Sequence, residues 1–247
     1  MIYVCEYDDT LPWTVIEKEA RRFGLADEDG LPESVQKPQA PRLAQRQARL
    51  RERVMARLLL EYALWREYGL HSLEELVWPT GRKGKPYSAA HPEIYFNMSH
   101  CETACACVTA DHEVGIDVER RFAFRPALAR RVCTEQERLL MERLPEAEQE
   151  RLLQVLWSMK ESYVKRDGRG LAYGLERIGL AVELEELRGL WSVKESLSKQ
   201  GRAGDFVVRV TPHYTLAVCG VQSDTAIIQV SEQECMRGER ADDKTGI

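Results

Sequence analysis

The spacing of apolar and polar residues divides this chain into strands and helices in an order typical of an α+β protein. Short apolar runs predict strands, and these cover residues 2–7, 94–99, 104–110, 114–118, 178–182, 206–210 and 214–221. An apolar stripe that includes Leu50, Leu58 and Trp65 predicts a long helix over residues 43–68. Further helices are predicted over residues 72–77, over residues 146–166 and after Thr134-Glu135-Gln136-Glu137, which fits a capping box.

Each half of the chain thus combines a long helix with about three predicted strands. This order predicts two α+β subdomains that join near residues 110–115. No close sequence repeat marks the halves, so the prediction of a duplication depends on the order of the elements alone. We place the first subdomain at residues 1–112 and the second at 113–230, and we expect the polar segment 231–247 to be flexible.

Composition narrows the class of protein. The chain has 247 residues, of which 44% are hydrophobic and 30% are charged, as in soluble globular proteins. A net charge of −5 argues against general nucleic-acid binding. The N-terminal residues lack a basic signal-peptide region, and no run approaches the roughly 18–20 apolar residues of a membrane span. We therefore expect a cytoplasmic protein whose seven cysteines are reduced and act as small buried apolar residues.

Two acidic motifs carry the candidate chemistry. Asp117 and Glu119 alternate in a predicted strand, so they share one face. Glu161 and Lys165 lie one helical turn apart on the second long helix. If the strand and the helix meet, three carboxylates and an ammonium converge, and oxygen ligands of this kind suit Mg²⁺ beside a pyrophosphate. Each pair alone is also typical of a surface strand or a solvated helix.

Two further motifs could bind phosphate. Ser99 and His100 end a predicted strand, and both can donate hydrogen bonds to a phosphate. The segment from Gly81 to Tyr87 is a cationic loop with two glycines that lacks the P-loop pattern. A structural histidine and a solvated hairpin are the alternative interpretations of these two motifs.

In this order and at these separations, the four motifs resemble those of the 4′-phosphopantetheinyl transferase family, in its longer, monomeric class that activates surfactin synthetase. The resemblance is specific over about residues 81–175. The residues that carry it are Gly84-Lys85-Pro86, Phe96-Asn97-Met98-Ser99-His100, Gly115-Ile116-Asp117-Val118-Glu119, Trp157-Ser158-Met159-Lys160-Glu161 with Lys165, and Gly168-Arg169-Gly170-Leu171.

The resemblance implies a fold and a reaction. The fold would be two similar subdomains, each a small antiparallel sheet with a packed long helix, related by a pseudo-twofold axis. Coenzyme A would bind between them, and the enzyme, a monomer of the holo-[acyl-carrier-protein] synthase type, would transfer 4′-phosphopantetheine to a serine of an apo acyl or peptidyl carrier protein. The other product would be 3′,5′-ADP, and Mg²⁺ would be held by Asp117, Glu119 and Glu161.

The resemblance also implies contacts to coenzyme A. Lys165 and Asp117 would lie at the pyrophosphate, His100 would pair with the 3′-phosphate with Ser99 beside it, and Lys85 and Pro86 would hold the adenosine end. The family places a cation near the start of the first long helix. Arg51 and Arg53 both fit this position, and an ungapped match falls between them on Glu52. We select Arg53 as the expected phosphate contact.

Several roles stay open at this level. Glu161 could be the general base for the serine hydroxyl or a metal ligand with a low pKa, and Lys165 is its expected catalytic partner. A basic run after the acidic strand could dock the acidic helix of a carrier protein, or it could be a solvated helix face. This run comprises Arg120, Arg121, Arg125, Arg130 and Arg131.

Two other classes of function compete with the transferase. A Mg²⁺-dependent phosphohydrolase or nuclease also needs three carboxylates, and a non-catalytic module could bind carrier domains or coenzyme A. Residues 191–196 nearly copy the motif at 157–162. We take the first copy as the active one because only there does Gly-x-Gly-Leu follow.

Overall fold

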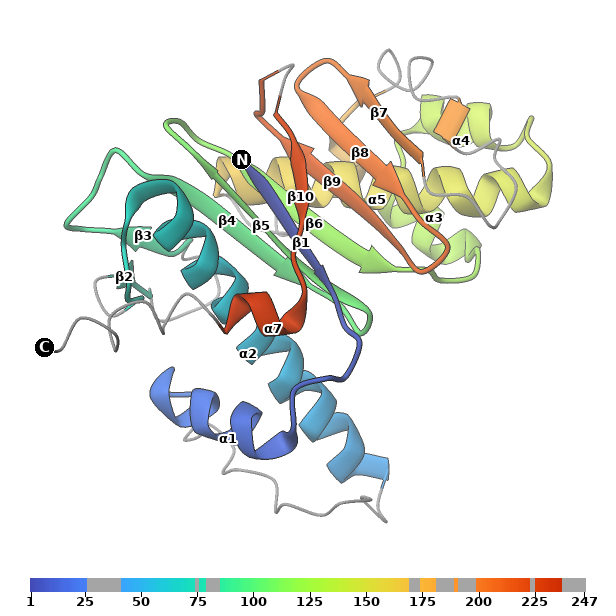
Figure 1. Ribbon diagram of the computed structural model, residues 1–247. Coiled ribbons are helices and arrows are strands. Elements are labelled where there is room, and N and C mark those ends of the chain that lie inside the picture. The colour runs from blue at the N-terminus through green and yellow to red at the C-terminus, as the bar shows by residue number, and fades with distance from the viewer. Residues whose placement is uncertain are drawn as a thin grey trace, which may run out of the picture.

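The computed structural model describes residues 1–25, 41–73, 76–78, 85–168, 174–180, 189–190, 199–222 and 225–236. Within these ranges two four-stranded sheets pack on each other, and a long helix covers the outer face of each (Figure 1). A small ladder of β2 (Leu76–Val77) and β3 (Tyr87–Ser88) accompanies them. The predicted α+β class is confirmed. None of the described helices is long and apolar enough to cross a membrane.

The first sheet has the strand order β10-β1-β5-β4, and α2 (Pro41–Tyr68) packs on it. β1 (Ile2–Glu6) pairs antiparallel with β5 (Ala104–Ala110), which pairs antiparallel with β4 (Tyr95–His100). β10 (Ile227–Gln229) runs parallel to β1. The expectation of a purely antiparallel sheet is therefore wrong here, because a late segment of the chain returns to the free edge of β1 (Figure 1).

The second sheet has the order β6-β9-β8-β7 and is antiparallel throughout. Its strands are β6 (Gly115–Arg120), β7 (Lys199–Ala203), β8 (Phe206–Val210) and β9 (Tyr214–Cys219). Its outer face packs on α5 (Glu146–Asp167), which in turn contacts α3 (Pro126–Val132). α4 (Glu135–Met141) and the 3₁₀ helix η2 (Leu175–Arg177) complete this side of the core.

The inner faces of the two sheets meet in an apolar layer. Fully buried members of this layer are Ile2, Val4, Ala106, Val108, Ile116, Val118, Leu216 and Val218. Because side chains alternate along a strand, Asp117 and Glu119 point away from the layer and toward α5. The fold therefore turns the acidic face of β6 toward the helix that carries Glu161.

Two predicted elements are wrong within the described residues. The helix predicted over 72–77 is replaced by strand β2, because Leu76 pairs with Ser88 across a ladder. Residues 178–180 follow η2 without forming a strand. The reason is local, because the Leu180 N–H donates to a side-chain oxygen of Glu137 at 2.9 Å rather than to a neighbouring strand.

Residues 231–236, within the segment expected to be flexible, form the short helix α7 (Glu232–Cys235) against α2. Ser231 and Glu234 close a capping box at its start. Glu232 is fully buried and pairs with Arg51 at 2.8 Å. Residues 231–236 are therefore ordered, and the rest of the expected tail lies outside the described residues. α1 (Trp13–Arg22) also packs on α2 and belongs to the same apolar core.

Candidate active site

The candidate site depends on an unusually close approach of α5 to β6 at Gly115. A Cβ atom there would lie 1.9 Å from the carbonyl oxygen of Ser162 and 2.5 Å from the backbone nitrogen of Arg166. Both neighbours are main-chain atoms that cannot rotate away, so only glycine fits. This contact fixes the distance between the acidic face of β6 and the helix that carries Glu161 and Lys165.

The structure places the three predicted carboxylates around this contact. Asp117 and Glu161 are 2% and 6% exposed, and Glu119 is half-buried. The charges of Asp117 and Glu119 both raise the pKa of Glu161, so the three carboxyl groups lie in one region of the interior. Burial of several acids at one place is costly unless a cation or protons compensate.

Lys165 and Ser99 complete the cluster. The Lys165 Nζ atom donates to Asp117 Oδ1 at 2.7 Å and to Ser99 Oγ at 2.9 Å. Ser99 Oγ donates to the same aspartate oxygen at 3.2 Å. Asn97, on the same face of β4, accepts the Ile116 N–H at 3.1 Å and so ties the two sheets together. Five of the residues selected from the sequence therefore meet: Ser99, Asp117, Glu119, Glu161 and Lys165.

The crowding changes the ionisation of two glutamates. Burial raises the pKa of Glu119 to about 7, and repulsion by Asp117 acts in the same direction. Burial likewise raises the pKa of Glu161 to about 7, with repulsion by Asp117 adding to the effect and Lys165 opposing it. One ammonium thus compensates three acids incompletely, and the site favours a further positive charge.

A divalent cation fits these residues in charge and donor type. Asp117 Oδ2 is buried and accepts no hydrogen bond, which leaves a strong acceptor available. Oxygen-only donors suit Mg²⁺. Within the described residues no group of three ligating side chains already has the arrangement of a metal centre, and the ammonium of Lys165 contacts Asp117 instead. The donors are present, but their coordination geometry is not preformed.

His100 does not lie beside Ser99 in space, because neighbouring residues of a strand point to opposite faces. Ser99 faces Asp117, whereas His100 faces α2, where its Nδ1 atom lies 3.1 Å from Glu52 Oε2. The ungapped family match to Glu52 therefore identifies a real neighbour of His100. That neighbour is an acid rather than the expected cation.

Lys85 precedes β3 in the chain, and its side chain contacts the residues just before β6. Its Nζ atom donates to Glu113 Oε2 at 2.6 Å and to the carbonyl oxygen of Val114 at 2.8 Å. Pro86 follows it and precedes β3. The two glycines of the cationic loop, at positions 81 and 84, lie outside the described residues.

Comparison with known proteins points to one family. Residues 113–183 match the family model described as the 4′-phosphopantetheinyl transferase superfamily. The chain is 31% identical over 125 residues to the 4′-phosphopantetheinyl transferase psf-1 of Bacillus pumilus, which covers 51% of this chain and 53% of that protein. It is 25% identical over 189 residues to Sfp of Bacillus subtilis (strain 168), with 72% and 79% covered. Over the second half of the chain, the sequence is thus similar to the 4′-phosphopantetheinyl transferase superfamily.

The superfamily match supports some site residues more directly than others. The matched span contains Asp117, Glu119, Glu161 and Lys165, but it begins after Lys85, Ser99 and His100. The chain spans about half the length of several of these relatives. Examples are psf-1 and the 4′-phosphopantetheinyl transferase gsp of Aneurinibacillus migulanus, of which 49% is covered at 31% identity.

The basic first half of α2 is partly structural. Arg51 pairs with the buried Glu232 at 2.8 Å and with Asp9 at 3.2 Å, and it donates to the Leu11 carbonyl at 3.0 Å. Its guanidinium therefore joins α2 to α7 and to the segment after β1. Arg53 is half-buried on the same helix and stays the predicted phosphate contact.

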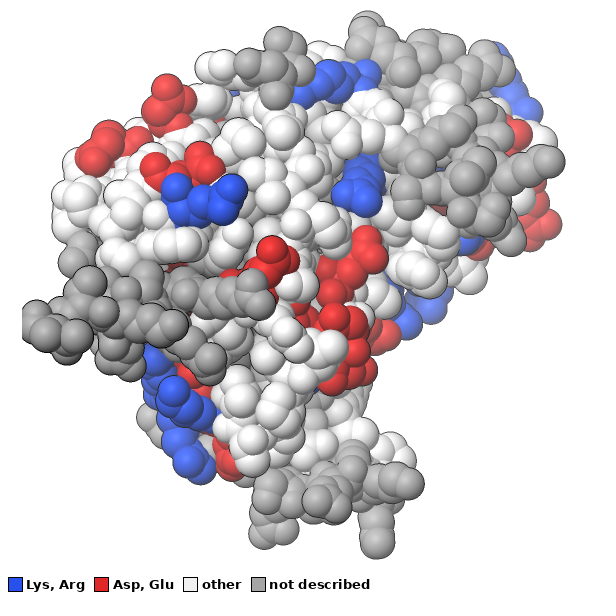
Figure 2. Space-filling model, in the orientation of Figure 1, with Lys and Arg blue, Asp and Glu red and all other residues white. Residues whose placement is uncertain are grey.

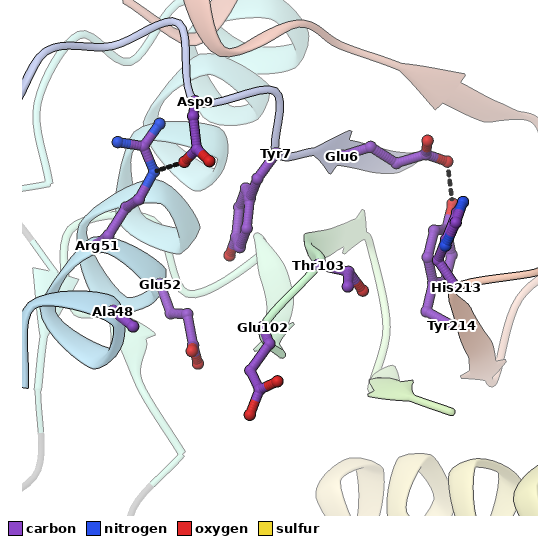
Figure 3. A pocket seen from close by; sticks show the side chains of 10 residues that line it. All are labelled: Glu6, Tyr7, Asp9, Ala48, Arg51, Glu52, Glu102, Thr103, His213 and Tyr214. Carbon is purple, nitrogen blue, oxygen red and sulfur yellow. Dashed lines mark hydrogen bonds and ion pairs between the residues drawn. The ribbon is translucent and has the colours of Figure 1, made fainter. Parts of the chain in front are cut away.

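Sequence reasoning missed a cavity of about 490 Å³ whose walls include Glu52, the partner of His100. Figure 3 shows its lining, which comprises Glu6, Tyr7, Asp9, Ala48, Arg51, Glu52, Glu102, Thr103, His213 and Tyr214. Four carboxylates and one arginine give it an acidic lining, and Figure 2 shows acidic side chains gathered near the middle of the face drawn. No local motif signals this cavity, because its walls come from segments that are far apart in the sequence.

Proposed function

We propose that this protein transfers 4′-phosphopantetheine from coenzyme A to a serine of an apo acyl or peptidyl carrier protein, producing the holo-carrier and 3′,5′-ADP. The observation that carries the proposal is the meeting of Asp117, Glu119 and Glu161 with Lys165 inside the span that matches the superfamily. The names of the relatives, all 4′-phosphopantetheinyl transferases, support the same reaction.

Mg²⁺ would be held by Asp117, Glu119 and Glu161, and it would neutralise charge on the pyrophosphate. Lys165, whose side chain is 31% exposed, can reach an incoming phosphate while its stem stays packed. Glu161 has a second possible role as the base for the serine hydroxyl, because a carboxylate with a pKa of about 7 is a competent base at neutral pH. Metal ligation and base catalysis both require Glu161 to lose its proton.

His100 would contact the 3′-phosphate of coenzyme A, with Arg53, Lys85 and Pro86 on the nucleotide side. Glu52 Oε2 lies 3.1 Å from Nδ1 of this imidazole, so the Glu52 carboxylate competes with a phosphate for His100. Glu52→Gln should lower the KM for coenzyme A roughly three- to tenfold, by removing a like charge. The KM for 3′-dephospho-coenzyme A should not change, and an equal change for both substrates would remove His100 from the phosphate site.

The carrier protein would dock on the arginines that follow β6. Two of them are engaged within the chain, since Arg120 pairs with Glu102 and Arg121 with Glu150, each at 3.1 Å. The three others, Arg125, Arg130 and Arg131, are exposed on and next to α3. They offer positive charge to the acidic helix that carrier domains of this system present.

A shallow groove next to α3 supports this docking surface. It has a volume of about 220 Å³, and Phe124, Arg130 and Met141 contribute to its walls. An apolar side chain of the carrier could enter it while its acids meet the arginines. Arg125→Glu/Arg130→Glu should raise the KM for carrier protein and leave that for coenzyme A unchanged, and an unchanged carrier KM would reject this surface.

The decisive experiment is incubation of the purified protein with coenzyme A, Mg²⁺ and an apo acyl carrier protein. Intact mass spectrometry should show the carrier gaining one phosphopantetheine group, and a carrier with its serine replaced by alanine should gain none. A Mg²⁺-dependent phosphohydrolase would release 3′,5′-ADP without any carrier. A non-catalytic binding module would bind the carrier or coenzyme A and leave both unmodified.

Three further properties belong to the proposal. A cytoplasmic location is supported by the seven cysteines, all of which are unpaired and buried. A pseudo-twofold relation between two subdomains is supported by the packing of one long helix on each four-stranded sheet. A monomer is what the resemblance implies, and light scattering would test it.

A further inference from the structure

A buried ion pair lies between α5 and the elements that carry the proposed docking surface. The side chains of Lys160 and Glu137 are both 0% exposed, and Lys160 Nζ lies 2.5 Å from Glu137 Oε2. Lys160 is next to Glu161 in the sequence but about 100° away around the helix, so it points away from the carboxylate site. Burying two charges is costly, and a buried pair alone is weak evidence for stability.

The hydrogen bonds of the pair join four segments of the second half. Lys160 Nζ also donates to the carbonyl oxygen of Val132, the last residue of α3, at 2.7 Å. Glu137 accepts the Thr134 N–H at the start of α4 at 2.7 Å. Its other oxygen accepts the Leu180 N–H at 2.9 Å. α3, α4 and the segment after η2 are therefore all anchored to α5 at one point.

We propose that Lys160 and Glu137 are positioning residues that hold α3, and with it Arg130 and Arg131, in a fixed register relative to Glu161. α3 also packs on α5 through apolar residues such as Ala129 and Val132. Apolar packing is non-directional, so it would let this seven-residue helix shift. The hydrogen bond from Lys160 to the carbonyl oxygen of Val132 is directional. Because Lys160 directly precedes Glu161, this bond links the end of α3 to the position of Glu161.

The inference rests on the proposed transferase function. A carrier docked on α3 must present its serine to Glu161, and a misplacement of about 1 Å can reduce a rate about a hundredfold. The ion pair thus governs the rate of the docked complex. Docking affinity itself comes from the exposed arginines, which the pair does not contact.

The test compares Lys160→Met with the double variant Lys160→Met/Glu137→Gln. The single variant leaves a buried carboxylate without its counter-ion and should be unstable. The double variant has no unpaired charge, so its stability should recover. We expect its kcat with saturating apo acyl carrier protein to stay at least tenfold below the wild-type value, because the tie from α5 to Val132 is still absent.

Two measurements separate positioning from a merely structural role. The Kd for apo carrier, measured by titration calorimetry without coenzyme A, and the KM for coenzyme A should both stay within twofold of wild type. Val208→Ala, in the same core, is the control for general destabilisation and should keep its kcat. A double variant with near-wild-type kcat, or an equal loss of kcat in the control, overturns the inference. A wild-type protein that binds but never modifies the carrier would instead overturn the proposed function.

Discussion

Replacing Glu161 by glutamine should stabilise the metal-free protein at pH 8 while it abolishes transfer. Glu161 is 6% exposed, and its pKa is raised from the usual 4.5 to about 7, first by burial and then by repulsion from Asp117. Each pKa unit corresponds to about 1.4 kcal/mol, so ionising this group destabilises the folded state by roughly 3 kcal/mol. Glu119 and Glu161 interact, so their titrations are coupled and part of this cost is shared. We therefore expect the unfolding free energy of the variant to exceed that of the wild type by about 2 kcal/mol.

The sign of the effect depends on pH in a defined way. Between pH 4.5 and about 7 the folded state retains a proton on Glu161 that the unfolded chain releases, so stability falls as pH rises through this window. Glutamine does not titrate. The difference in unfolding free energy between the variant and the wild type should therefore be near zero at pH 4.5 and complete by pH 8.

Urea unfolding followed by circular dichroism, with chelator present, measures this difference. The unfolding midpoint of Glu161→Gln should exceed that of the wild type by roughly 1 M urea at pH 8, given typical m-values. Glu142→Gln, at an exposed position, is the matched control and should change neither midpoint. A Glu161→Gln protein that is less stable at pH 8, or that differs equally at both pH values, would refute the account of crowded carboxylates.

Three other predictions follow from the same site. Mg²⁺ affinity, measured by titration calorimetry, should rise roughly tenfold or more from pH 6 to pH 8, because the metal must displace protons from Glu119 and Glu161, whose pKa values are about 7; an affinity independent of pH would contradict this. Gly115→Ala should lower the unfolding free energy by about 3 kcal/mol through overpacking, whereas Gly179→Ala, which meets open space, should be neutral in the same urea titration. Lys165→Met removes the charge that opposes the rise at Glu161, so the pH window of falling stability should extend to higher pH, and an unmoved window would argue against that coupling.

The core of the site could be predicted from the sequence because its geometry is local. A period of two along β6 groups Asp117 with Glu119, and a period of about four along α5 groups Glu161 with Lys165. Alternation also separates Ser99 from His100, although the motif had suggested one phosphate contact from both. What the local patterns could not give is the distance between β6 and α5, which Gly115 sets.

Other features escaped prediction because they depend on contacts between distant segments. β10 is only three residues long, too short for a periodic signal. Lys160 and Glu137 look like solvated helix charges in the sequence, and only their burial shows otherwise. The near-copy of the catalytic motif at residues 191–196 lies outside the described residues, so the choice of the first copy stays a prediction supported by the cluster around Glu161.

The parallel pairing of β10 with β1 has a consequence for biosynthesis. Ile2 lies opposite Ile227 and Val4 opposite Gln229, so the ribosome adds more than two hundred residues between the two partners. Until the later strand emerges, the outer backbone groups of the earlier one are exposed to solvent and to any neighbouring nascent chain. Translation that stops short of residue 227 would therefore yield a polypeptide with an open sheet margin, which is prone to self-association.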